Sequence, residues 1–226
     1  MTSWRLYAFD FDGTLVDSYS CLPAVWRRIG EYLNLEESFL DLFVKYVLIE
    51  EDLGDVRGEH DVSKWVRRAL DKLKLEIDFN SEELAALYWK YRIEGTTVLP
   101  CVEDILKVLK EKECIVASVS GDDGVKSLKK KRIMQSGLSR FFDNIIVAGE
   151  DVPGKGDAMV LLADKYGLSR RECVLIDDKP GPINDVSKKG FPTIKVDFKC
   201  ILKEAWKDEC SPTVRLRNIC ELLNFI

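Results

Sequence analysis

The 226-residue sequence has few of the residues that build structural zinc sites: it contains one histidine, and its seven cysteines include no C-x-x-C pair. A structural zinc site is therefore not expected. We expect most cysteines to be buried small side chains. Their odd number argues against a complete disulfide framework, although it leaves room for one or two bridges. The single glutamine, with 32% charged residues, hints at a thermophilic source.

Long apolar runs are also missing. No stretch approaches the roughly 20 apolar residues that a membrane-spanning helix needs, and the N-terminal residues do not resemble a secretory signal. We therefore expect a cytoplasmic protein with no membrane partner. The net charge of −5 provides no overall attraction to nucleic acid. One basic run, residues 126–132, is interpreted as the solvated face of a helix.

Apolar periodicity divides the chain into two parts. A short apolar run at residues 6–9 predicts a buried strand. Beyond it, helical periodicity predicts helices at 22–33, 38–50, 62–75 and 81–93, the last with Asn80 as N-cap. Strands and helices then alternate. Strands are predicted at 114–119, 145–148, 173–176 and 193–196, and helices at 102–109, 125–134, 158–166, 183–189 and 219–226.

This alternation predicts an α/β protein with a Rossmann-like, doubly wound parallel sheet. Residues 1–17 and 96–226 would form this core domain, and residues 18–95 an inserted α-helical cap domain of four helices. In such folds ligands bind at the carboxyl ends of the strands. We expect the insertion to lie over that edge, because it directly follows the first strand.

Two aspartates follow the first predicted strand, in the segment D-F-D-G-T-L-V-D-S. Carboxylates at positions i and i+2 leave a strand on the same side, so Asp10 and Asp12 can face one reacting centre. One can attack while the other handles the proton. The segment resembles the first motif of the haloacid dehalogenase-like phosphohydrolases, in their phosphoglycolate phosphatase and β-phosphoglucomutase branch. The resemblance implies that Asp10 is the nucleophile, Asp12 the general acid and base, and Thr14 a phosphate-binding residue.

Two further motifs of this superfamily follow in the expected order. The strand end V-A-S-V-S-G matches the second motif, whose hydroxyl residue binds phosphate. The resemblance assigns this role to Ser118 with its neighbour Val119, and Ser120 is the runner-up. Lys155, just before a predicted helix, matches the third motif. A cation there would offset the negative charge of nucleophile and phosphate. Gly156 departs from the Lys-Pro pair that is usual in the family.

An acidic pair, Asp177 and Asp178, ends a later predicted strand and matches the fourth motif. The commoner pattern has a second acid four residues on, where this chain has Pro182; Asp185 is a less favoured substitute. The resemblance implies a Mg²⁺ site, since hard oxygen ligands select Mg²⁺ rather than zinc. Its implied ligands are the Asp10 carboxylate, the Asp12 backbone carbonyl, Asp178, and Asp177 through a bound water.

The charge of these groups makes a prediction about Asp12. Four converging carboxylates would face only Mg²⁺ and Lys155, so a dianionic phosphate would enter a negative site. We therefore expect Asp12 to carry a proton when substrate binds, which is the state that can protonate a leaving alkoxide.

The predicted function is Mg²⁺-dependent hydrolysis of a small organic phosphate monoester through an aspartyl-phosphate. A phosphoryl transferase or phosphomutase of the same family is one alternative, and a non-catalytic binding or regulatory module is another. A dehalogenase is disfavoured because Asp12 is present. A helical cap would open for exchange and close for chemistry. We expect a monomer or a small homo-oligomer.

Several residues outside the motifs are weaker candidates. Arg57, expected in a loop at residues 50–61 together with His60, could bind a second anionic group of the substrate. Asp122 would repel phosphate if it points inward. Cys101, which replaces a glycine of the family's turn, is expected to be a buried structural residue.

Overall fold

The computed structural model describes residues 4–198 and 209–226, which form two compact units. Residues 4–17, 97–198 and 209–226 belong to an α/β unit, and residues 18–96 belong to a helical unit. No helix in the described ranges combines the length and the apolar character needed to cross a membrane. The assignment of the two units as core and cap domains stays a prediction.

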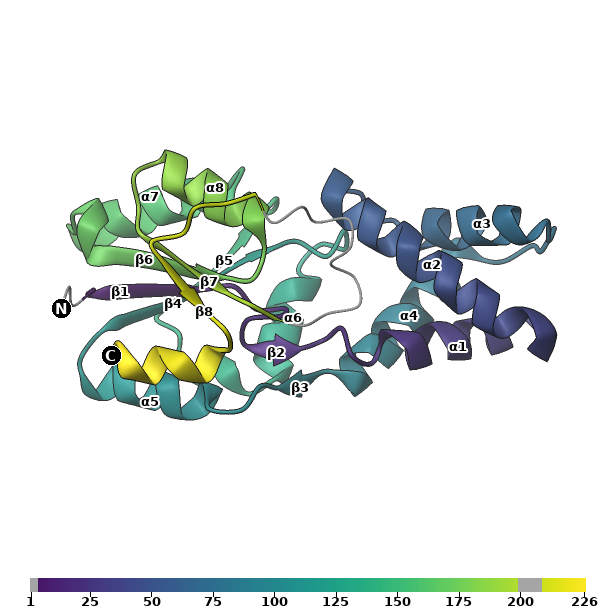
Figure 1. The fold of residues 1–226 in the computed structure, drawn as a ribbon, viewed down its shortest axis with the longest axis horizontal. Coiled ribbons are helices and arrows are strands. Elements are labelled where there is room, and N and C mark those ends of the chain that lie inside the picture. Colours follow the sequence, from purple (N-terminus) through teal and green to yellow (C-terminus); the bar gives the residue numbers. More distant parts are fainter. Residues whose placement is uncertain (1–3, 199–208) are drawn as a thin grey trace. The chain divides into compact units, whose positions relative to one another are not determined.

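A six-stranded parallel sheet forms the centre of the α/β unit (Figure 1). Its strands are β1 (Leu6–Phe9), β4 (Ile115–Gly121), β5 (Asn144–Ala148), β6 (Cys173–Asp177), β7 (Thr193–Val196) and β8 (Val214–Leu216). They lie in the order β5-β4-β1-β6-β7-β8, so β1 is paired with β4 on one side and β6 on the other. This confirms the predicted doubly wound parallel sheet and adds β8, a strand that the sequence did not indicate.

Helices cover both faces of this sheet (Figure 1). On one face lie α5 (Val102–Glu111), α6 (Leu128–Gln135) and the 3₁₀ helices η1 (Leu138–Phe141) and η3 (Ile219–Asn224); on the other lie α7 (Lys155–Tyr166) and α8 (Pro180–Lys188), with η2 (Arg170–Glu172) preceding β6. Alternation along β1 explains both layers. Tyr7 and Phe9 enter the first core and Leu6 and Ala8 the second, as the period of two in a strand requires.

Three elements of this unit differ from the prediction. Helix α6 begins at Leu128, not at the predicted residue 125, because Gly124 and Ser127 adopt left-handed conformations with φ of 73° and 63°. The chain end is a 3₁₀ helix rather than the predicted α-helix. The sequence also missed the antiparallel pair β2 (Val16–Asp17) and β3 (Thr97–Val98), since two residues are too short to show periodicity.

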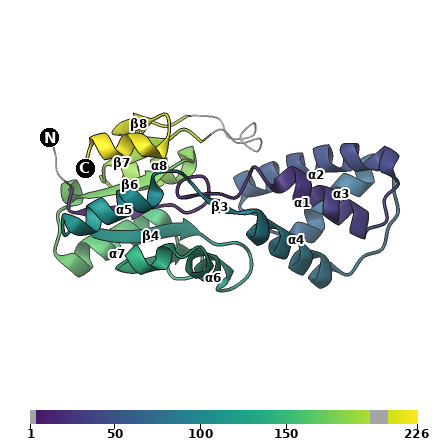
Figure 2. The ribbon, with the colours of Figure 1, turned by 90° about the horizontal axis from the view of Figure 1, so that it is seen from below.

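The helical unit consists of α1 (Leu22–Tyr32), α2 (Glu37–Arg57), α3 (Val62–Leu73) and α4 (Ser81–Gly95), shown from a second direction in Figure 2. Helix α2 packs against α1 and α3, and α4 packs against the same two helices. The structure confirms Asn80 as N-cap of α4, because its side chain accepts the backbone N–H groups of Glu82 and Glu83 at 3.0 and 3.1 Å.

The predicted end of α2 at residue 50 was wrong, and so was the loop expected at 50–61. The helix continues to Arg57 because its central acids are buried and paired rather than solvated. The Glu51 carboxylate accepts hydrogen bonds from Trp26 Nε1 and Tyr88 Oη, both at 2.7 Å, and from Arg92 at 3.0 Å. Burial raises the pKa of Glu51, although Arg92 and these hydrogen bonds oppose the shift.

The cysteines differ from the expected set of buried side chains. Cys101 and Cys220 form a disulfide that joins the start of α5 to η3, and Cys101 itself is half-buried. Of the remaining thiols in the described ranges, Cys173 is buried, and Cys21, Cys114 and Cys210 are half-buried. Cys200 lies outside the described residues. The pairing was not foreseen because its partners are 119 residues apart.

Candidate active site

The candidate site lies at the carboxyl edge of the sheet, where β1 ends between β4 and β6. Phe9, the last residue of β1, pairs in register with Ser118 of β4 and Ile176 of β6. Asp10 therefore emerges beside the end of β6, which places it next to Asp177. The strand order reverses direction around β1, and such switch points are where ligands bind in open α/β sheets.

Lys155 lies between two of the predicted site carboxylates. It is the first residue of α7, and its Nζ lies 2.6 Å from Asp10 Oδ1 and 2.7 Å from Asp177 Oδ2. All three side chains are buried. The structure thus brings together the residues of the first, third and fourth sequence motifs. Buried charge-assisted hydrogen bonds of this kind fix the ammonium group against the nucleophile candidate.

The pKa values in this cluster reflect burial and an excess of negative charge. Burial, reinforced by Asp10 and Asp178, raises the pKa of Asp177 to about 7, although Lys155 pulls it down. Burial alone would lower the pKa of Lys155, but the charges of Asp10 and Asp177 outweigh it and raise that pKa. One ammonium group is therefore shared by acids that it does not fully neutralise.

Three of these acids could hold a metal ion. Asp10, Asp177 and Asp178 are buried, and each offers one carboxylate oxygen within 4.8 Å of the others. An all-oxygen donor set with a net negative charge fits a hard divalent cation such as Mg²⁺. The Asp12 side chain is not part of this group. Ligation through the Asp12 backbone carbonyl, and the role of Asp177 in holding a water, stay predictions.

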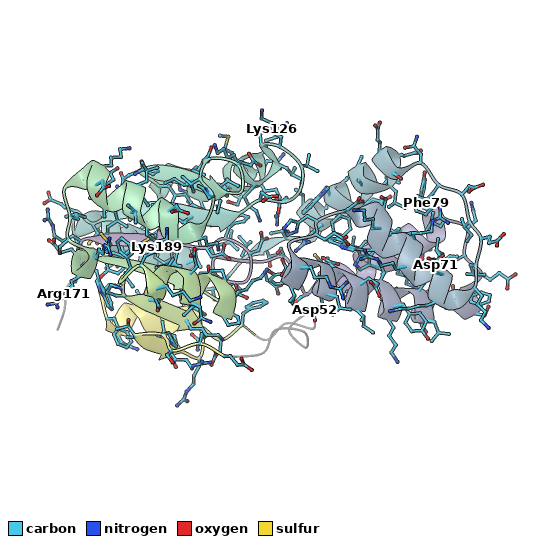
Figure 3. All side chains as sticks on the ribbon, turned by 90° about the horizontal axis from the view of Figure 1, so that it is seen from above. Asp52, Asp71, Phe79, Lys126, Arg171 and Lys189 are labelled. Atoms are coloured by element: carbon cyan, nitrogen blue, oxygen red, sulfur yellow. A yellow bond between two sulfur atoms is a disulfide. The ribbon has the colours of Figure 1, made fainter. Side chains whose placement is uncertain are left out.

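Asp185 lies outside this group of acids and does not replace the missing second acid there. Its Oδ2 accepts the backbone N–H of Gly156 at 2.7 Å, at the start of α7. The departure from Lys-Pro at Gly156 is thereby explained, because proline has no N–H to donate. A side chain at position 156 would also meet Lys189, labelled in Figure 3, at 2.8 Å and Asp185 at 3.0 Å. A larger residue here would therefore require the Lys189 side chain to shift.

The basic run at residues 126–132 is not simply a solvated helix face. Lys126, labelled in Figure 3, and Lys131 are exposed, but Lys129 and Arg132 of α6 are only 5% and 3% exposed. Their spacing of i and i+3 puts both on one side of the helix. The prediction was wrong for these two cations, because the face that α6 buries is the one that carries them.

Lys129 and Arg132 both contact Asp12. Lys129 Nζ donates to Asp12 Oδ2, while Arg132 Nη2 donates to Oδ1 and Nη1 lies 3.0 Å from Oδ2. Asp123 binds the same two cations, at 2.7 Å from Lys129 Nζ and 3.0 Å from Arg132 Nη1. The Arg132 guanidinium lies 5.6 Å from the centre of the Phe11 ring. We call Asp12, Asp123, Lys129 and Arg132 the Asp12 network. The charge count made from the sequence had omitted its two cations, so the proton expected on Asp12 no longer follows from that count and stays a prediction.

The remaining residues predicted to bind phosphate, Thr14, Ser118 and Val119, are buried. Ser118 and Val119 are buried in β4, and Ser118 Oγ lies 3.4 Å from Ser120 Oγ. Thr14 Oγ1 is buried and has no hydrogen-bond partner among the residues described, so it retains a free polar group. Asp122 Oδ1 accepts the backbone N–H of Gly124 at 2.8 Å, which closes a local turn.

Two of the candidates outside the motifs, Arg57 and His60, lie in the helical unit. Arg57 is exposed at the last residue of α2, and Gly58 follows in a left-handed conformation with φ of 67°. His60 is half-buried. A substrate-binding role of Arg57 stays a prediction.

Sequence reasoning missed Asp123, Lys129 and Arg132. The available signal was the spacing of the two cations on one helix face, together with the acid that directly follows Asp122 at the end of β4. That signal was ambiguous, since exposed helices commonly carry the same pattern.

Comparison with known proteins gives a consistent family. Residues 4–181 match the family model described as haloacid dehalogenase-like hydrolase. A phosphoglycolate phosphatase of Escherichia coli strain K12 is 25% identical over 236 residues, covering 97% of this chain and 91% of that protein. These similarities extend across both units of the chain.

Solved structures share the fold. The HAD hydrolase YfnB from Bacillus subtilis, bound to magnesium, has a TM-score of 0.75 at 22% identity, covering 99% of this chain and 98% of that one. A predicted phosphoglycolate phosphatase from Haemophilus somnus has a TM-score of 0.72 at 18% identity, covering 100% and 99%. With the motif residues gathered at one sheet edge and the family model spanning residues 4–181, the chain belongs to the haloacid dehalogenase-like hydrolases.

Proposed function

We propose that this protein is a Mg²⁺-dependent phosphohydrolase of small organic phosphate monoesters that works through an aspartyl-phosphate on Asp10. The observation that carries the proposal is the buried cluster of Asp10, Asp177 and Asp178 around the single ammonium group of Lys155. Its excess of negative charge is suited to a divalent cation, and its lysine to a phosphoryl group. The similarity to a phosphoglycolate phosphatase supports the choice of substrate class and suggests 2-phosphoglycolate as a substrate to test.

The residues have separate roles in this proposal. Asp10, Asp177 and Asp178 would hold Mg²⁺, which supplies electrostatic stabilisation of the phosphoryl oxygens. Lys155 restrains the Asp10 carboxylate and offsets its charge beside an anionic substrate. The buried Thr14 hydroxyl and Ser118 would bind phosphate. Asp12 would give a proton to the leaving oxygen and later take one from water.

The test is phosphate release from a panel of phosphate esters that includes 2-phosphoglycolate, with and without Mg²⁺. Asp10→Asn should abolish Mg²⁺-dependent release, because an amide cannot form the acyl phosphate. Asp164→Asn, an equivalent change at an exposed position of α7, is the matched control and should retain activity. Release that survives in Asp10→Asn would refute the nucleophile.

Product analysis separates hydrolysis from transfer. Free phosphate formed in step with the alcohol supports a hydrolase, whereas an isomeric phosphate ester supports the phosphomutase alternative. Mg²⁺ binding without turnover of any ester would favour the non-catalytic module. The cytoplasmic location and the oligomeric state stay predictions.

A further inference from the structure

The Asp12 network differs from an ordinary surface ion-pair cluster in its burial. Its four side chains are at most 10% exposed, and they come from three separate segments: the loop after β1, the loop after β4 and helix α6. Buried ion pairs of this kind contribute little net stability, because removing charges from water costs about as much as their attraction returns. The fold of α6 could have been secured by apolar residues, so stability alone does not explain this arrangement.

The geometry of the network restrains one group closely. Both oxygens of the Asp12 carboxyl group face the Arg132 guanidinium, whose planar donors match a carboxylate in a fixed orientation. Lys129 approaches one of the same oxygens. Asp123 contacts both cations and so fixes their positions in turn. While Asp12 is ionised, the two anions and two cations of the network balance; when Asp12 carries the proton that the first step below requires, one positive charge remains to offset part of the charge of an anionic phosphate.

We propose that Lys129 and Arg132 are positioning residues that hold the Asp12 carboxyl group in place for proton transfer, with Asp123 orienting the two cations. The inference rests on the proposed function, in which Asp12 is the general acid and base. A general acid must lie within hydrogen-bond reach of the leaving oxygen, and errors of about an ångström are costly to the rate.

The chemistry shows which step depends on this positioning. The first step starts from Asp12 in its protonated form: an Asp10 oxygen bonds to phosphorus, the ester P–O bond breaks, and its electron pair and the Asp12 proton go to the leaving oxygen, which leaves Asp12 ionised. In the second, a water oxygen bonds to phosphorus, its proton goes to Asp12, and the bond to Asp10 breaks. An alkoxide leaves poorly without the proton, whereas p-nitrophenolate leaves readily as the anion. Misplacing Asp12 should therefore impair alkyl esters more than aryl esters.

The experiment compares kcat/KM for glycerol 3-phosphate and p-nitrophenyl phosphate, because this parameter reports the steps up to release of the leaving group. A better alkyl ester found in the substrate panel would replace glycerol 3-phosphate. Arg132→Gln and Lys129→Met should each lower the alkyl-to-aryl ratio by about tenfold or more, a fraction of the roughly 10²- to 10⁴-fold effect of general acid catalysis. Arg132→Lys, which keeps the charge, should restore part of it. Lys131→Met, an exposed position on the same helix, should leave the ratio unchanged.

A double variant tests whether a loss of activity comes only from unfolding. Lys129→Met combined with Asp123→Asn removes one charge of each sign and keeps the network balanced, and stabilisation by Mg²⁺ in a thermal melt would show that the metal-binding acids remain in place. The inference is overturned if folded variants lose activity equally on both esters, or retain both activities while Asp12→Asn lowers the alkyl-to-aryl ratio. Wild-type protein that is inactive on all esters, or an active Asp10→Asn variant, would instead refute the proposed function, and this inference with it.

Discussion

The disulfide between Cys101 and Cys220 provides a sharp prediction about stability. It closes a loop spanning 119 residues of sequence, and η3 packs against α5 in the same apolar core. By the chain-entropy relation, closing a loop of this length restricts the unfolded chain by about 5 kcal/mol at 25 °C. Cys220→Ser should therefore lower the free energy of unfolding of the α/β unit by up to about 5 kcal/mol.

The backbone at Cys101 allows a finer comparison. Its φ of 65° is left-handed, a conformation that costs a residue with a side chain about 1 kcal/mol relative to glycine. Cys101→Ser should match Cys220→Ser, whereas Cys101→Gly should lose about 1 kcal/mol less. The order of the free energies of unfolding of the three variants therefore distinguishes loss of the disulfide from relief of backbone strain at position 101.

Guanidinium unfolding followed by circular dichroism, with and without dithiothreitol, measures these differences. Reductant should lower the wild-type midpoint to that of Cys220→Ser and leave the midpoint of that variant unchanged. Cys114→Ser, which alters a thiol outside the bridge, serves as the control. A wild-type midpoint that is insensitive to reductant and equal to that of Cys220→Ser would refute the loop-closure reasoning.

Three further predictions concern the active-site cluster. Lys155→Met should lower kcat by at least about 100-fold in steady-state assays, since it removes the cation held against Asp10; a kcat within a few-fold of wild type would contradict this. The pKa of Asp177 is raised to about 7, so protonation of this carboxyl group stabilises the metal-free protein at low pH, and this contribution is lost as the pH rises through about 7. The increase in melting temperature that Mg²⁺ produces should therefore grow from pH 6 to pH 8. An increase that does not depend on pH would argue against Asp177 as a metal-binding residue. Gly156→Pro should reduce both melting temperature and activity, because it removes the N–H bond to Asp185, whereas Gly156→Ala should keep that bond and lose less activity.

The core of the candidate site was predictable from the sequence. Asp10, Lys155 and the pair Asp177 and Asp178 each follow a short apolar run or precede a helix. In a parallel sheet the carboxyl ends of neighbouring strands meet at one edge, so placing the three acids on strand ends, and Lys155 at the start of the helix that follows another strand, was enough to bring them together. The motifs also specified their order along the chain. Their chemical roles remain to be tested.

The Asp12 network and the end of α2 could not be predicted in the same way. In the sequence, Lys129 and Arg132 have the pattern of solvent-exposed charges. The acids that precede Arg57 were interpreted as part of a loop that follows the helix. In both cases the outcome depended on what packs against the helix. A local pattern reports the spacing of polar groups, but it does not report whether a partner of opposite charge lies opposite them.

Apolar periodicity over short ranges was sufficient to predict the parallel sheet and the strand ends that carry the acids. The tertiary structure alone decided that Cys101 pairs with Cys220 and that α6 turns its two cations toward Asp12. Those contacts join residues 117 to 120 positions apart. Their energies depend on burial and on the distance between charges, which exist only after the chain has folded.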